Sequence, residues 1–177
     1  MPTEISGSTG VNKIQDNTIV NADINSSAAI AGSKLVMPTG SVLQVAAAVD
    51  TTRVTFTGTN DYLGLQTVLT PSSTSNKILV MASAGLSSSG TGRVEMKCYY
   101  GTTGGDNSGS QATGTAQVAQ PNAVNTANLG HASFSWLISP NSTSPIYVKL
   151  VGHKHDSGTG YYNYWGSASI VAMEIAG

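Results

Sequence analysis

The chain has 177 residues, of which 40% are hydrophobic and 10% are charged, and its formal net charge at pH 7 is −1. This combination excludes an intrinsically disordered chain, because disorder requires low hydrophobicity together with a high net charge. The eight Lys and Arg residues are scattered, so the sequence lacks the basic patch that attracts nucleic acids or anionic membranes, and we expect neither as a partner.

Residues 1–38 are predicted to form an anchor and trimerisation segment. Their aliphatic residues recur at spacings of five, five, six and five, which fits neither a helix nor a single strand. Short strands that wind around an axis would produce such a spacing, and these few residues would then be buried against other copies of the chain or against a larger host structure. The alternative is a polar leader in which the isoleucines are incidental. The predicted anchor residues are Ile14, Ile19, Ile24, Ile30 and Leu35.

Residues 39–177 are predicted to form one all-β domain. Apolar-rich runs of strand length alternate with clusters of Gly, Ser, Thr, Asn and Pro, and no helical stretch separates them. This pattern favours an antiparallel jelly-roll-type β-sandwich. The predicted strands are residues 42–49, 53–57, 62–69, 77–86, 93–100, 113–119, 131–138, 146–153 and 169–175.

Two of these strands carry further information. In 93–100, alternation places Cys98 on one face and Glu95 and Lys97 on the other, and Cys98 is expected to be buried and inert. The run 78–82 is apolar on both faces, so we expect a strand whose outer side is also covered, at a subunit contact.

Two long polar loops, residues 101–111 and 155–165, are candidates for glycan recognition. Aromatic rings stack on sugar faces, while Asn side chains and Tyr hydroxyls bond sugar hydroxyls. The alternative is that the aromatic residues pack a trimer interface, where Tyr and Trp are common. The candidate glycan-binding residues are Asp106, Asn107, Tyr161, Tyr162, Tyr164 and Trp165.

His153 and His155 are the best candidates for metal ligands. Two histidines at positions i and i+2 of a strand point to the same side, so Zn²⁺ or Ni²⁺ could bridge them, with Asp156 or a symmetry mate completing the shell. The alternative, which we favour from the sequence, is a solvated strand end with two exposed histidines. The sequence therefore predicts no metal.

The remaining motifs argue against catalysis. The chain has no P-loop, no dinucleotide-binding fingerprint and no nucleophile elbow. Its nine acidic residues are scattered, and glycoside hydrolysis would need two of them, for example Asp106 and Asp156, to face each other in the fold. We expect no enzymatic activity and no cofactor.

Three segments resemble virion structural proteins of tailed bacteriophages, particularly those of aquatic and cyanobacterial phages. They are KIQDNTIVNADINSSAAIAGSKL, GSVLQV and TPSSTSNKILVMASAGL. In that group a leader of the form I-x-D-x-x-I-x-N-x-D-I commonly precedes a β-sandwich head that begins G-S-V-L-Q-V.

The resemblance implies a homotrimer on the virion surface, with intertwined leaders at its base and a jelly-roll knob above. Such a knob is either a capsid decoration or a tail-fibre module. At most 38 residues precede the knob, which favours a short knob anchored to the capsid or to another virion protein. The alternative is a receptor-binding tail-fibre tip that recognises a host cell-surface glycan.

Overall fold

The structure, a computed structural model, describes residues 36–89, 94–112, 130–155, 158–163 and 166–177. The compact unit Met37–Gly177 contains all of them except Val36. The five predicted anchor residues, from Ile14 to Leu35, lie outside the described residues, so the anchor and the domain boundary at residue 38 stay predictions. Within the described ranges all regular elements are strands, and no helix there is long and apolar enough to cross a membrane.

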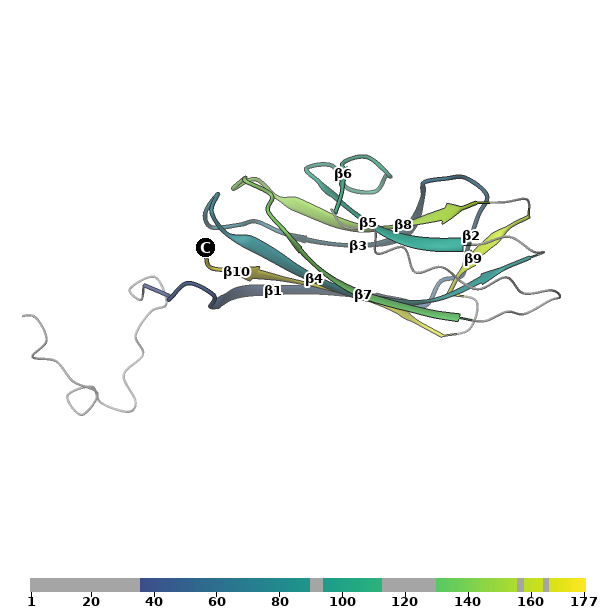
Figure 1. The fold of residues 1–177 in the computed structure, drawn as a ribbon, viewed down its shortest axis with the longest axis horizontal. Coiled ribbons are helices and arrows are strands. Elements are labelled where there is room, and N and C mark those ends of the chain that lie inside the picture. Colours follow the sequence, from purple (N-terminus) through teal and green to yellow (C-terminus); the bar gives the residue numbers. More distant parts are fainter. Residues whose placement is uncertain (1–35, 90–93, 113–129, 156–157, 164–165) are drawn as a thin grey trace, which may run out of the picture. The chain divides into compact units, whose positions relative to one another are not determined.

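The strands form two antiparallel sheets that pack face to face as a sandwich (Figure 1), which confirms the predicted all-β fold. The six-stranded sheet has the order β1 (Val42–Asp50), β10 (Ala168–Ile175), β4 (Lys77–Ser88), β9 (Gly160–Tyr162) and β2 (Val54–Phe56), with β7 (Gly130–Ile138) also paired to β4. The four-stranded sheet has the order β3 (Asp61–Leu69), β8 (Ile146–Lys154), β5 (Val94–Gly101) and β6 (Ser110–Gln111).

Most predicted strands agree with the observed ones to within two residues at each end. The predicted strand at 113–119 lies outside the described residues. Two short strands, β6 and β9, form inside the segments that were predicted to be loops. With two and three residues, they are too short to show a period of two in the sequence.

The core lies between the sheets and consists of the inward side chains of both. Alternation along each strand supplies these side chains, and each fully buried aliphatic residue contributes about 1.5–3 kcal/mol. Cys98 belongs to this core, as predicted, and burial raises the pKa of its thiol to about 12. The largest apolar contributors include Leu63, Ile78, Val80, Leu86, Val94, Met96, Leu150, Tyr162 and Ile170.

A bulge in β3 keeps its core side chains in place. Between Tyr62 and Gln66 the register against β8 advances by only two residues, from Val151 to Lys149. The two extra residues of β3 are an even number, so the alternation of inward and outward side chains is preserved. Gly64 lies in the bulge with φ +85°, a left-handed conformation that glycine adopts without strain.

A buried carboxylate fastens one end of the six-stranded sheet. Glu174 of β10 is 1% exposed and accepts hydrogen bonds from Asn76 Nδ2 at 2.6 Å, Gln44 Nε2 at 2.6 Å, and the backbone amide and hydroxyl of Ser72 at 2.6 and 2.9 Å. Burial alone would raise the pKa of Glu174, but these donors outweigh it, and the net pKa is lowered.

Candidate functional site

The outer side of the six-stranded sheet is an apolar surface formed by β1, β10, β4 and β7. The register places Val45 opposite Met173, Met173 opposite Leu79, and Leu79 opposite Leu137, so one apolar row crosses four strands. We call this surface the apolar face. It consists of Val45, Ala47, Val49, Leu79, Met81, Leu137, Val171 and Met173, with Ser135 opposite Met81, followed by a row of serines, Ser83, Ser133 and Ser169.

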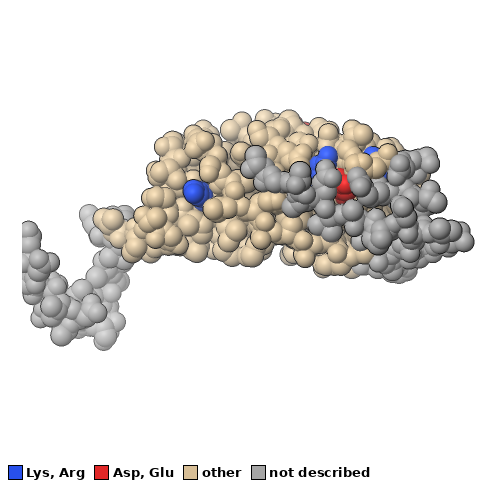
Figure 2. Space-filling model, in the orientation of Figure 1, with Lys and Arg blue, Asp and Glu red and all other residues tan. Residues whose placement is uncertain are grey.

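The apolar face is accessible and uncharged in the described part of the chain. Val45, Met81 and Leu137 are 58%, 38% and 52% exposed, and the rows from Val45 to the serines contain no Asp, Glu, Lys or Arg. The exposed Lys77, which also points outward from β4, borders the face one row beyond Leu79. Figure 2, in the orientation of Figure 1, shows few charged side chains among the described residues on the side of the sandwich that it views. The prediction that residues 78–82 carry apolar side chains on both faces of the strand is confirmed. Ile78, Val80 and Ala82 are buried, and the two residues between them face outward. The subunit contact itself stays a prediction.

The outer side of the four-stranded sheet has the opposite character. It carries Glu95, Lys97 and Lys149, all of which are buried. The loop that leads to β6 passes over this side (Figure 1). Gly104 lies so close to the Tyr147 ring that a Cβ atom there would come within 2.5 Å of it. The loop between β5 and β6 therefore packs on the outer side of β8 at Tyr147 and Lys149.

An ion pair holds this loop on the sheet. Lys149 is fully buried, and its Nζ donates to Asp106 Oδ1 at 2.7 Å and to the Thr103 carbonyl at 2.8 Å. These contacts satisfy a charge that would be costly to bury alone. The hydrogen bond from Lys149, with those from Ser108, lowers the pKa of Asp106 to about 2. Asp106 was expected to contact a glycan, and in the structure it neutralises a buried lysine.

The other candidate glycan-binding residues lie in different places. Asn107 Nδ2 donates to the Asn60 carbonyl, which also fastens the loop. Tyr161 and Tyr162 lie on β9, where Tyr162 is fully buried and Tyr161 is half-buried under the Arg53 guanidinium, 4.6 Å from the ring centroid. The structure therefore removes Tyr162 from the surface group, because its side chain points into the core. Tyr164 and Trp165 lie outside the described residues.

The two histidines lie side by side, as the i, i+2 spacing predicts. The ring centroids of His153 and His155 are 4.1 Å apart. Their neighbour Glu95 was not predicted from the sequence. It pairs with His153 in the β5–β8 register, and its Oε1 lies 2.7 Å from His155 Nε2. Burial lowers the pKa of His153, and the nearby Lys97 charge lowers it further. Asp156, which was expected to complete the set, lies outside the described residues.

Comparison with known proteins gives distant likenesses only. No protein-family profile matches the chain, and no curated protein sequence matches it. Among solved structures, the VP2 subviral particle of infectious bursal disease virus aligns with a TM-score of 0.40 and 14% identity over 85% of this chain and 37% of that chain. The T=1 particles derived from the same virus align with a TM-score of 0.35 and 16% identity over 85% and 41%. This chain thus spans less than half the length of these matches, and such values assign neither a family nor a function.

Proposed function

We propose that this chain is a non-enzymatic structural protein of a phage virion that assembles as a homotrimer through its apolar face. In this proposal, residues 1–38 anchor the trimer to the capsid or to another virion protein, and the β-sandwich forms a knob on the particle surface. The observation that carries the proposal is the uncharged apolar face across β1, β10, β4 and β7. The sequence resemblance to phage virion proteins supplies the biological setting.

The apolar face fits a second copy of the chain better than a charged partner. Soluble monomers rarely expose a large contiguous apolar patch, and such patches mark interaction sites. Copies of an uncharged surface meet without like-charge repulsion, whereas a charged partner would lose hydration there without gaining an ion pair. The serine row at one end of the face offers hydroxyls, and Ser83 Oγ already lies 3.0 Å from Ser169 Oγ.

The predicted anchor directly precedes β1 in the sequence. Val36 is 98% exposed and Met37 is 45% exposed, and they precede β1, which lies at the end of the sheet order that carries the apolar face. Anchor and apolar face are thus adjacent in sequence, which suits a single assembly interface that uses both.

The native mass of the untagged full-length protein tests the proposal. Light scattering or native mass spectrometry should give three times the chain mass of 18.1 kDa. A stable monomer at micromolar concentration would contradict the assembly. Mass spectrometry of purified virions should detect the chain, and a version that lacks residues 1–38 should fold but fail to join particles. Incorporation of that truncated version would contradict the anchor.

A further inference from the structure

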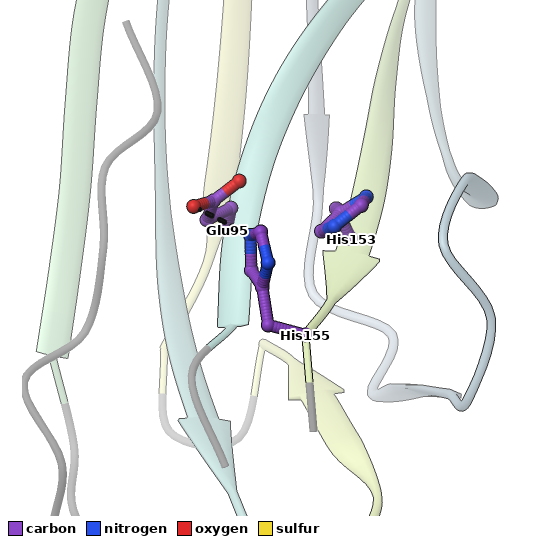
Figure 3. Close-up of side chains that lie close together, drawn as sticks. All are labelled: Glu95, His153 and His155. Carbon is purple, nitrogen blue, oxygen red and sulfur yellow. Dashed lines mark ion pairs between the residues drawn. The ribbon is translucent and has the colours of Figure 1, made fainter. Parts of the chain in front are cut away.

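Three side chains of metal-ligand type converge at one end of the four-stranded sheet. Glu95 comes from β5, His153 lies opposite it on β8, and His155 follows just beyond the end of β8 (Figure 3). One potential ligand atom from each residue can be chosen so that all three lie within 4.8 Å of one another. Three different positions of the chain therefore bring two imidazoles and a carboxylate into one small volume.

Burial and contact distances distinguish this cluster from a chance surface group. The Glu95 side chain is 1% exposed, the His155 side chain is 28% exposed, and the two meet at 2.7 Å between Oε1 and Nε2. A buried carboxylate requires a compensating partner, which a proton on His155 or a metal ion can equally supply. Because His155 is partly exposed, an ion could enter from solvent on its side.

The surroundings of His153 suit a ligand that binds through Nε2. Its Nδ1 contacts the Thr59 carbonyl oxygen, and a proton on Nδ1 donated to that carbonyl leaves the lone pair of Nε2 available. Metal-bound histidines in proteins are oriented by this kind of contact. One feature opposes this arrangement: the Lys97 ammonium, which can only donate, lies 2.9 Å from the same Nδ1. It competes with a proton on Nδ1 and adds positive charge beside the site.

We propose that Glu95, His153 and His155 form a binding site for one Zn²⁺ ion. Two imidazole nitrogens and one carboxylate oxygen are a donor set that suits zinc, and water can take the fourth tetrahedral position. Zinc bonds of about 2.0–2.1 Å separate tetrahedral ligand atoms by roughly 3.3–3.4 Å. To reach this separation, Glu95 Oε1 and His155 Nε2 would move apart from their present 2.7 Å. The His153 ring would move closer to both, and side-chain rotation is enough for these changes. The bound ion would fasten β5 to β8, independently of how the chain assembles.

Zinc titration of untagged, metal-free protein tests the site. We expect one Zn²⁺ per chain by calorimetry, and a rise in Tm that EDTA reverses, because binding to the folded state alone stabilises it. Glu95→Gln and His155→Ala should each weaken zinc binding by about 10-fold to 100-fold or more. Loss of a residue that only orients a zinc ligand already weakens binding by that factor. Lys97→Met should strengthen binding, because it removes the opposing charge.

His131→Ala is the matched control, because His131 is an exposed histidine on β7. It should bind zinc as the wild type does. Circular dichroism checks that each variant folds. If Glu95→Gln does not fold, His155→Ala still tests the site, because His155 lies outside the core. With Co²⁺ in place of Zn²⁺, visible absorption should report tetrahedral coordination and vanish in His155→Ala. Absence of wild-type binding, or equal affinity in the folded Glu95 and His155 variants, would overturn the proposal.

Discussion

The outer sides of the two sheets differ in what covers them. The six-stranded sheet presents the apolar face, where Leu137 and Val45 are about half exposed and no charged residue interrupts the rows. The four-stranded sheet carries buried charged residues on its outer side, and the loop between β5 and β6 pairs one of them, Lys149, with Asp106. The difference shows that polarity alone does not decide which surface is left for a partner. A loop that supplies counter-charges can close a polar side, whereas an apolar side needs another chain.

A charge placed on the apolar face should have the largest effect, because it would remove the difference between the two outer sides. Met81→Glu puts a carboxylate in the middle of the proposed interface, and an unpaired charge buried there costs several kcal/mol. The native mass should fall from three chains to one. Val68→Glu is the control, because Val68 is similarly exposed, at 44%, but lies on β3 of the other sheet. A trimer that survives Met81→Glu, or dissociates equally in both variants, would contradict the interface.

Removing the counter-charge should open the covered side. Asp106→Asn leaves the fully buried Lys149 ammonium without its carboxylate, so we expect a lower Tm and faster proteolysis within residues 101–111. The double variant Asp106→Asn with Lys149→Met should recover part of the lost Tm, because an apolar side chain needs no counter-charge. Equal Tm values for the wild type and Asp106→Asn would show that the ion pair does not hold the loop.

Glu174 of the six-stranded sheet is a buried charge that can be compared with Lys149 of the four-stranded sheet. Glu174 is satisfied by hydrogen bonds from neutral donors, including Asn76 and Gln44, rather than by a cation. Glu174→Gln replaces one acceptor oxygen with an NH₂ group that faces those donors, and should lower the free energy of unfolding by about 1–3 kcal/mol. Urea unfolding measures this change, and the trimer mass should persist, since Glu174 faces away from the apolar face.

The smallest expected effect is the pH dependence of the stabilisation that Asp106 provides. The folded-state pKa of Asp106 is about 2, below its ordinary value of 3.8. A depressed pKa stabilises the fold at any pH above the ordinary value, and this stabilisation is lost as the pH falls through the folded value. The difference in Tm between wild type and Asp106→Asn should therefore be constant above about pH 4 and shrink toward pH 2. A difference that does not change over this range would contradict the assigned pKa.

The strands and their buried sides could be predicted from the sequence, because alternation is a local property. The placement of Cys98 in the core and the two-sided run at residues 78–82 both follow from it. The side-by-side placement of His153 and His155 was predictable for the same reason.

The pairings between distant segments could not be predicted. Lys149 and Asp106 are 43 residues apart, and their contact depends on how a Gly-rich loop folds back. Glu95 meets the histidines only through the β5–β8 register, which no single strand encodes. β9 forms because Gly160–Tyr162 finds partners on both β2 and β4, so its strand character comes from neighbours rather than from its own three residues.

The pairing of β1 with β10 has a consequence for synthesis. These strands lie at the two ends of the domain's sequence, and β1 forms its ladder along the sheet with β10. On the ribosome, β1 emerges long before β10, and such non-local pairing is slow to form. The apolar face is therefore completed only after the last strand has been made. Assembly through the complete face would thus begin only with finished domains.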